Sequence, residues 1–238
     1  MPRAFLPIRQ ELFSRKGDLL NCGKGCRYPI TVMVMAFRLR LTGVGAMNSP
    51  RFAPAGLLVE YDGIRVMIDG NHASPGPLPL DAWLVTDTRS ELIRDIRNAA
   101  SRRGIVAQVT RFSSGGLTLK PLPVTHTSHD TFGYVVTAEQ ARVAWAPEFF
   151  IFPEWAADSD LMFADAAGWD RPIRFSGHVG GHAAAWTVAT EARNRRVRRL
   201  VFAHIGRPTI RAMEQGKRPP YGSFGHDGEK FEPRRWRR

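Results

Sequence analysis

Two series of short apolar segments, each closing with an amphipathic helix and neighbouring strands, constrain the fold of this chain more than any other feature. The clearest pair is residues 56–61 and 64–69, joined by the dipeptide Asp62-Gly63, which is typical of two-residue hairpin turns. Each series can bury an apolar sheet face only by packing against the other. We therefore predict an α/β fold, an αββα sandwich of two mixed β-sheets flanked by helices. The expected strands are 37–41, 56–61, 64–69, 82–85, 105–111, 117–124, 133–138, 142–146, 161–164 and 199–203, and the expected helices are 91–103 and 183–196.

The composition indicates a folded, cytoplasmic protein. A chain of 238 residues with 43% hydrophobic residues suffices for one large domain, or two small ones, with a buried core. It has no run of 18 apolar residues, which a transmembrane helix requires, and residues 1–30 lack the apolar stretch of a signal peptide. The two cysteines, Cys22 and Cys26, are too few for a structural zinc site. We expect reduced thiols and no membrane partner.

The net charge of +12 is concentrated in three segments of the chain. Residues 1–34 contribute +4, the arginines of 193–199 contribute +5 and residues 207–238 contribute +5, which leaves about −2 for the remainder. We therefore divide the chain into a loosely ordered N-terminal extension (1–34), a folded domain (35–212) and a basic C-terminal tail (213–238). Solvated faces and tails explain this basicity most simply. Binding of RNA, DNA or a phosphate-rich substrate is the alternative.

Two histidines lie where α/β folds commonly place their chemistry. His182 precedes the predicted helix 183–196, and His204 follows the predicted strand 199–203. Loops and helix starts converge at the C-terminal ends of strands, so side chains from both positions can meet there. Two imidazoles at one such edge favour a metal site or an acid–base site. A purely structural histidine is the alternative at each position.

Several short motifs between residues 36 and 210 match one known family. They include 41–46 (Leu-Thr-Gly-Val-Gly-Ala), the paired segments 56–60 and 66–70, of which the second ends in Asp-Gly, and 200–205 (Leu-Val-Phe-Ala-His-Ile). Together they resemble the metallo-β-lactamase-fold hydrolase superfamily, in particular its branch of transfer-RNA 3′-processing endonucleases and phosphodiesterases. The resemblance implies the αββα sandwich and a metal-dependent hydrolysis of a phosphodiester or another ester.

The family's His-x-His-x-Asp-His motif is replaced in this sequence. It would follow residues 83–86 (Trp-Leu-Val-Thr), where the chain instead continues Asp-Thr-Arg-Ser-Glu-Leu. Asp87, Arg89 and Leu92 stand at the three histidine positions. Glu91 stands at the aspartate position. Because zinc needs three or four nitrogen, oxygen or sulfur donors, and a leucine supplies none, we do not expect the family's usual dinuclear zinc centre.

The later motifs of the family are retained and supply the other candidate ligands. His126, with His129 as the alternate, stands at the next metal-binding histidine, before a Gly-Tyr strand. Glu148 stands at the metal-bridging aspartate, and His204 at the last metal-binding histidine. The resemblance thus implies an oxygen-rich site for one divalent zinc, manganese or iron ion, or for none where the site is degenerate. The implied metal ligands are Asp87, Glu91, His126, Glu148 and His204.

Catalytic roles follow from the same resemblance. A metal-bound water would be the nucleophile, oriented by Glu148 or Asp87. His182 matches an acid–base histidine of the RNA-processing branch and would protonate the leaving oxygen. Arginine side chains near the site would bind the phosphate or carboxylate of the substrate by charge-assisted hydrogen bonds. The candidate substrate-binding residues are Arg89, Arg207, His178 and His129.

A catalytically inactive member of the family is the alternative function. Such a protein would bind a nucleic acid, a nucleotide or a protein, and Arg89 would replace the metal charge by pairing with Asp87 or Glu148. Imidazoles and carboxylates that converge within ligand distance favour the enzyme, whereas an Arg89 ion pair favours the binding module. As an enzyme, the protein would act on a small-molecule or nucleic-acid phosphodiester, and we expect a homodimer.

Overall fold

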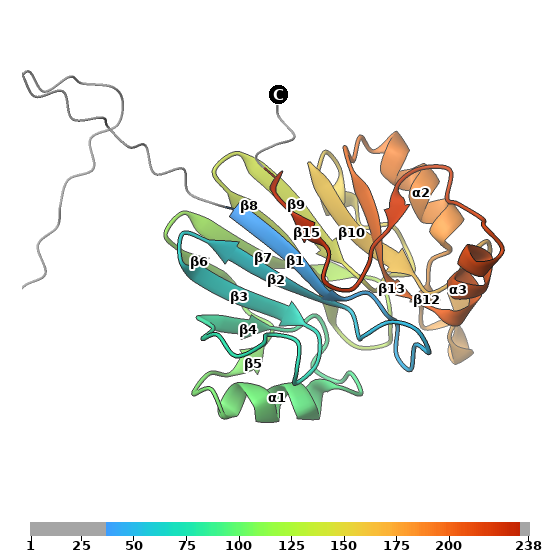
Figure 1. Ribbon diagram of the computed structural model, residues 1–238. Coiled ribbons are helices and arrows are strands. Elements are labelled where there is room, and N and C mark those ends of the chain that lie inside the picture. Colours follow the sequence, from blue (N-terminus) through green and yellow to red (C-terminus); the bar gives the residue numbers. More distant parts are fainter. Residues whose placement is uncertain (1–36, 234–238) are drawn as a thin grey trace, which may run out of the picture. The chain divides into compact units, whose positions relative to one another are not determined.

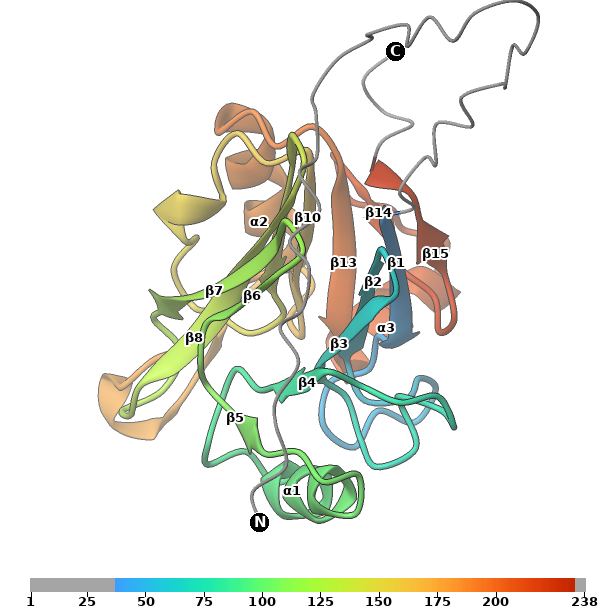
Figure 2. The same ribbon diagram turned by 90° about the vertical axis from the view of Figure 1, so that its left-hand side faces the viewer.

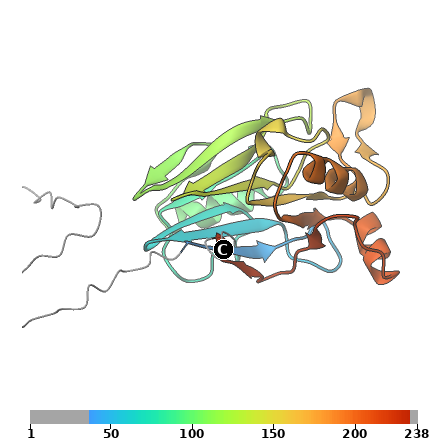
Figure 3. The ribbon, with the colours of Figure 1, turned by 90° about the horizontal axis from the view of Figure 1, so that it is seen from above.

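The structure, a computed structural model, describes residues 37–233, and there two large β-sheets face each other in two layers (Figures 1 and 3). Helix α1 (Ile93–Ser101) lies beneath β4 and β5 in Figure 2 and packs on the face of the first sheet that is turned away from the main core, and α2 (Ala185–Asn194) lies on the outer side of the second sheet. The predicted αββα sandwich is confirmed. The first sheet contains, in spatial order, β15 (Lys230–Phe231), β1 (Phe37–Gly43), β2 (Gly56–Tyr61), β3 (Ile64–Asp69), β4 (Ala82–Leu84) and β5 (Ala107–Gln108). The second contains β14 (Ser223–Phe224), β13 (Leu200–Ile205), β10 (Leu161–Ala166), β9 (Ala141–Ala146), β8 (Thr131–Ala138), β7 (Leu117–Val124) and β6 (Phe112–Ser114).

The first strands follow the pattern of the sequence. In β1 the apolar residues Phe37, Leu39 and Leu41 are buried, whereas the intervening basic residues are not. The β2–β3 hairpin turns at Asp62 and Gly63, whose φ angles are 47° and 80°. Two consecutive positive φ angles characterise the type I′ turn that suits the twist of a hairpin. This hairpin has the predicted bounds.

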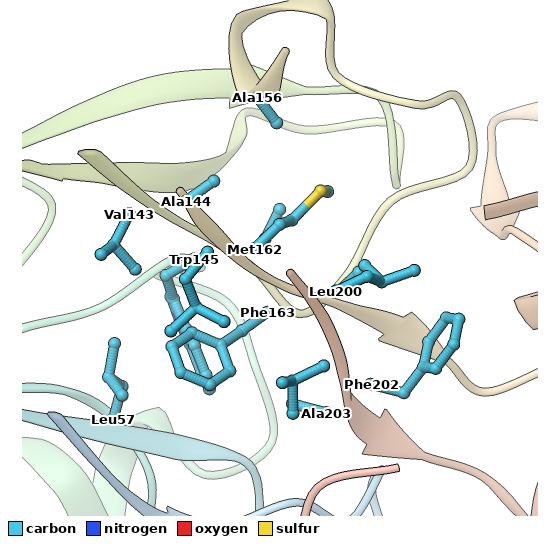
Figure 4. Close-up of a cluster of buried hydrophobic side chains, with 14 of the residues drawn as sticks. Leu57, Val143, Ala144, Trp145, Ala156, Met162, Phe163, Leu200, Phe202 and Ala203 are labelled. Carbon is cyan, nitrogen blue, oxygen red and sulfur yellow. The ribbon is translucent and has the colours of Figure 1, made fainter. Parts of the chain in front are cut away.

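The main hydrophobic core lies between the two sheets (Figure 4). Trp145 of β9 and Phe163 of β10 are fully buried, with ring centroids 5.7 Å apart, and Leu57 of β2 reaches the same core from the facing sheet. A second, smaller cluster packs Trp83 of β4 against Ile96 of α1. Burial of apolar surface on both sides of the first sheet therefore fixes β4, the strand that leads into the candidate site.

Parallel strands bring the candidate residues to one edge of the sandwich. Strands β9, β10 and β13 are mutually parallel, so their C-terminal ends lie at the same edge of the second sheet. Glu148 follows β9, Asp165 lies near the end of β10 and His204 lies near the end of β13. In the first sheet, β3 and β4 are parallel and end at Asp69 and shortly before Asp87. Both sheets therefore contribute strand ends to the site.

The folded domain extends beyond the predicted boundary at residue 212. Helix α3 (Arg207–Glu214) was not predicted and has Pro208 in its first turn. Strand β14 adds to the second sheet beside β13, and β15 pairs with β1 and buries Phe231 to 2% exposure. The expected separate tail (213–238) is thus incorrect as far as residue 233. Strands of two residues are too short to show a periodic pattern, and the surrounding sequence is basic and rich in glycine and proline. The sequence therefore did not predict them.

Other expectations differ in smaller ways or lie outside the described residues. The predicted strand 105–111 shortens to β5, and pairing resumes in β6. The predicted extension 1–34 and both cysteines lie outside the described residues. Within residues 37–233, every helix is too short or too polar to cross a membrane.

Candidate active site

The carboxylate of Glu148 lies at the centre of the candidate site. Its Oε2 atom is 3.4 Å from His126 Nε2, and its Oε1 atom is 3.2 Å from His204 Nδ1. The side chain of Glu148 is 25% exposed. Burial of the carboxylate raises its pKa, although His126 and His182 act in the opposite direction. The structure therefore brings together Glu148, His126 and His204, as the sequence predicted.

His126 is held by a glycine hairpin, the two-stranded unit of β11 (Ile173–Arg174) and β12 (Gly181–His182). His126 Nδ1 lies 2.8 Å from the Gly181 carbonyl oxygen, and the Gly181 N–H donates to the His126 carbonyl at 2.8 Å. Gly180 has a φ of 147°, and a Cβ at this position would lie 2.1 Å from the His126 carbonyl oxygen. Glycine is therefore required for this approach. Because a carbonyl only accepts, Nδ1 of His126 carries a hydrogen, and Nε2 is the ring atom that faces Glu148.

His182 is supported by Asp165, a residue that was not predicted. Asp165 is fully buried, and its Oδ2 atom lies 2.8 Å from His182 Nδ1. The same carboxylate accepts hydrogen bonds from the N–H groups of Phe149 at 3.1 Å and Ala167 at 2.8 Å. Burial lowers the pKa of His182, but the charge and hydrogen bond of Asp165, together with the charge of Glu148, raise it above 6.5 overall. The sequence contains one sign of this role, because Asp165 is the only acidic residue in the apolar segment 161–166.

His204 adopts an unusual backbone conformation at the end of β13. Its φ is 60°, and the pairing of β10 with β13 shifts register between Ala164 and Ala166. Its ring stacks on that of His182, with centroids 5.1 Å apart and an interplanar angle of 20°. Burial lowers its pKa to about 4, although Asp165 and Glu91 act in the opposite direction. A non-glycine residue held at positive φ is a common feature of functional sites.

A small pocket of about 60 Å³ opens beside these groups. Asp87, Glu91, Glu148 and His204 line it, so four of the five predicted metal ligands face one space. Asp87 is 8% exposed, and its Oδ1 atom lies 2.9 Å from His129 Nε2. Glu91 is exposed and precedes α1. The alternate histidine of the β7–β8 loop thus contacts the carboxylate of Asp87, whereas His126 contacts that of Glu148.

Asp69, a second residue that was not predicted as part of the site, lines this pocket and is held by several hydrogen bonds. Its Oδ2 atom accepts a hydrogen bond from Trp145 Nε1 at 2.8 Å, and its Oδ1 atom accepts from the Thr86 N–H at 2.7 Å and the Thr86 hydroxyl at 3.0 Å. Burial raises its pKa to about 7, although these hydrogen bonds act in the opposite direction. Asp69 therefore joins the end of β3, the chain after β4 and the inter-sheet core.

None of the four predicted substrate-binding residues (Arg89, Arg207, His178 and His129) lines this pocket. Arg89, Arg207 and His178 are all exposed. The backbone N–H of Arg89 donates to Asp87 Oδ1 at 2.7 Å, but its guanidinium forms no ion pair with Asp87, Glu148 or any other residue between 37 and 233. Within residues 37–233, Arg89 therefore does not take the place of a metal ion by pairing with a carboxylate. Such a pairing would have indicated a binding module.

The residue types at the site suit a divalent metal ion, but their arrangement does not. Imidazoles and carboxylates are suitable ligands for manganese, iron and zinc. Yet no group of three or more histidine, cysteine, aspartate or glutamate side chains in the described part of the chain is arranged to hold a metal ion. Glu148 lies between His126 and His204, Asp87 contacts His129, and Leu92 lines the pocket without a donor atom. The predicted five-residue ligand set is not a preformed metal centre, so we assign no chemical step to a metal.

Comparisons with known proteins agree with this fold and with the position of the site. The family model described as "Beta-lactamase superfamily domain" matches residues 75–205, more than half of the chain and the part that contains every predicted site residue except Arg207. The chain belongs to this superfamily. No curated protein matches the sequence.

Solved structures place this superfamily member in the metallo-β-lactamase fold. A diphosphatase from the PhnP family superposes with a TM-score of 0.63 at 18% identity, covering 83% of this chain and 97% of that one. Zn(2+)-bound PqqB from Methylobacterium extorquens gives 0.61 at 14% identity, with 82% and 99% covered. The short form of human tRNase Z gives 0.62 at 12% identity, with 82% and 98% covered. At these identities the likeness establishes the shared fold.

Proposed function

We propose that this superfamily member is a hydrolase of a phosphodiester or another ester, with Glu148 as its general base and His182 as its general acid. The observation that carries the proposal is the contact of His182 with the fully buried Asp165 beside the carboxylate of Glu148. A carboxylate behind an imidazole fixes its tautomer and stabilises the imidazolium form. Titratable groups whose pKa values are shifted by burial and by a specific charged partner are characteristic of acid–base sites.

Each proposed role follows from the position of the group. Glu148 lines the pocket and accepts a proton from an attacking water, whose oxygen forms the new bond to phosphorus or carbon. His182 keeps 13% of its side chain exposed; with Nδ1 directed at Asp165, its Nε2 atom gives a proton to the departing oxygen. His204, whose pKa is about 4, stays neutral at pH 7 and stacks on the ring of His182, so it adds no positive charge beside that imidazole.

Arg89 supplies the contact to an anionic substrate. It lies in the chain between the pocket residues Asp87 and Ser90, and its side chain is exposed. A guanidinium at this rim fits a phosphodiester through paired hydrogen bonds. The relatives support the same substrate class, because those of known structure include a diphosphatase and a tRNase Z.

A catalytically inactive binding module is the second candidate function. Leu92 favours it, because an apolar side chain lines the pocket where the family has a donor. The convergence of His126 and His204 on Glu148, without an Arg89 ion pair, favours the enzyme instead.

The test is turnover of bis(4-nitrophenyl) phosphate, 4-nitrophenyl phosphate and 4-nitrophenyl acetate by the full chain. We expect hydrolysis of at least one of them, and a loss of about 10²–10⁴-fold in His182→Ala and in Glu148→Gln. His72→Ala is the matched control, because His72 is an exposed histidine outside the pocket, and it should retain full activity. No turnover by a folded wild-type chain, or equal turnover by the His182 variant, would refute the proposal.

A further inference from the structure

A second pocket, larger than the first, lies between the loop after β1 and the segment that follows α3. Its volume is about 350 Å³, against about 60 Å³ for the pocket beside Glu148. This size falls in the range of sites that bind small organic molecules, about 300–1,000 Å³. None of its lining residues belongs to the smaller pocket, although the loop of residues 44–55 contributes to both. We call it the α3 pocket.

The ionisable residues of the α3 pocket are all of basic type. Arg51, Lys217, Arg218 and His226 line it, and no aspartate or glutamate does. The side chains of Arg51, Lys217 and Arg218 are exposed, and none of the three forms an ion pair with a residue between 37 and 233. An uncompensated cluster of cations around a concave surface attracts an anion.

The arginines at 195–198, another basic cluster of the described residues, differ from the α3 pocket in their pairing. Arg195 contacts Glu154 and Glu191, Arg196 contacts Asp158 at 2.7 Å, and Arg198 contacts Asp160 at 3.4 Å. These arginines are therefore neutralised by neighbouring carboxylates. The basic residues of the α3 pocket, in contrast, form no ion pair within residues 37–233, so their charge is available for a ligand.

The walls of the α3 pocket are fixed by the fold. Asp227 Oδ1 accepts the N–H of Val44 at 2.9 Å and its Oδ2 accepts the N–H of Ala53 at 2.8 Å, which ties the loop carrying Arg51 to the turn carrying His226. Both carboxylate oxygens of Asp227 therefore accept hydrogen bonds from the backbone. On the other side, Gly216 ends α3 with a φ of 71° and turns the chain toward Lys217. The basic groups are thus held around a preformed space.

An apolar surface accompanies the charges. Met213, Pro219 and Phe224 line the same pocket. The ring of Phe224 is held at 6.0 Å from Phe202 and 6.1 Å from Trp169, centroid to centroid. A ligand that combines an anionic group with a flat or apolar body would contact both kinds of surface.

We propose that the α3 pocket binds a phosphate-bearing small molecule of nucleotide size, separately from the hydrolytic site. The phosphate oxygens contact Arg51, Lys217 and Arg218, because guanidinium and ammonium groups offer several donors to a phosphate. The ring of the ligand packs on the apolar side formed by Phe224 and its neighbours. This ligand site does not depend on turnover at Glu148 and His182.

Calorimetric titration of the full chain with ADP, with inorganic pyrophosphate and with adenosine tests the proposal. We expect ADP to bind most tightly, pyrophosphate more weakly and adenosine least. Lys217→Gln and Arg218→Gln should each raise the Kd of ADP by about tenfold or more, because each removes one charge-assisted contact. Arg94→Gln is the matched control, since Arg94 is an exposed arginine on α1, and it should leave the Kd unchanged.

Three results would overturn the proposal. They are no binding of ADP or pyrophosphate at millimolar concentration, an equal loss in the Arg94 control, and binding of a single-stranded oligonucleotide far more tightly than ADP, which would assign the surface to nucleic acid. Unchanged ADP binding in His182→Ala would confirm that the α3 pocket is separate from the hydrolytic site. Loss of binding in that variant would refute the separation.

Discussion

Replacing Asp165 by asparagine should remove the support of His182 while conserving the shape of the side chain. Asp165 is fully buried, and its two oxygens accept three hydrogen bonds, from Phe149, Ala167 and His182. An asparagine keeps one oxygen and turns the other acceptor into a donor. If the oxygen faces the Ala167 N–H, the amide NH₂ faces both the Phe149 N–H and His182. His182 can adapt by changing its tautomer, but the Phe149 N–H cannot.

The magnitude follows from these contacts. A buried N–H left without an acceptor costs about 1–3 kcal/mol. When His182 is protonated, the loss of its buried carboxylate partner brings the total to about 3–5 kcal/mol. Because the folded pKa of His182 is raised above 6.5, its contribution to stability is fully present below pH 6.5 and disappears as the pH rises through the folded pKa. The destabilisation by Asp165→Asn should therefore be larger at pH 6 than at pH 9.

Urea unfolding at pH 6 and pH 9, together with an NMR titration of the His182 imidazole, measures both effects. We expect the imidazole to titrate above pH 6.5 in the wild type and at a lower pH in Asp165→Asn. Asp158→Asn is the matched control, because Asp158 forms an exposed pair with Arg196, and it should leave the unfolding free energy nearly unchanged. An equal loss at both pH values, with an unmoved His182 titration, would contradict the role given to Asp165.

Three further predictions concern the surrounding fold. His204 should stay neutral down to about pH 4, so the protein should lose about 3 kcal/mol of stability as the pH falls from 6.5 to 4. His204→Leu should reduce this dependence of the unfolding free energy on pH, as measured by urea unfolding. The same pH dependence in wild type and variant would contradict the prediction. Phe231→Ala should lower the unfolding free energy by about 3–4 kcal/mol, because Phe231 is 2% exposed and its ring centroid lies 5.1 Å from that of Phe163. Lys230→Ala should leave it almost unchanged. An unchanged unfolding free energy in both variants would place β15 outside the core. Gly180→Ala should displace the His126 carbonyl from the β11–β12 hairpin, lower the melting temperature and broaden the NMR signals of His126. Gly228 also has a positive φ but lies in open space, so Gly228→Ala should leave His126 undisturbed. Unchanged His126 signals in Gly180→Ala would contradict this contact.

The sequence predicts the parts of this fold that depend on local pattern and turn chemistry. The β2–β3 hairpin at Asp62-Gly63 and strand β7 have the predicted bounds, because apolar alternation and turn residues act over a few positions. Strands β14 and β15 have two residues each and exist only through pairing with distant strands, so no local pattern could indicate them.

The same contrast applies to the candidate site. The family motifs placed His126, Glu148 and His204 together, and the structure confirms that these three converge. The support of His182 by Asp165 was missed, because the two residues lie 17 positions apart in the sequence and only the tertiary structure brings them into contact. Neither Arg89 nor Arg207 lines the pocket, and the sequence could not predict this, because the direction of a side chain depends on the tertiary structure.

The most direct test of acid–base hydrolysis is turnover, by metal-depleted protein, of whichever of the three 4-nitrophenyl esters the untreated protein hydrolyses. The metal content of the same sample would be determined by plasma mass spectrometry after treatment with a chelator. We expect turnover to persist after depletion and to disappear in Glu148→Gln. Turnover that stops on depletion, and returns in proportion to restored zinc, manganese or iron, would contradict it and show that the hydrolysis needs a metal ion.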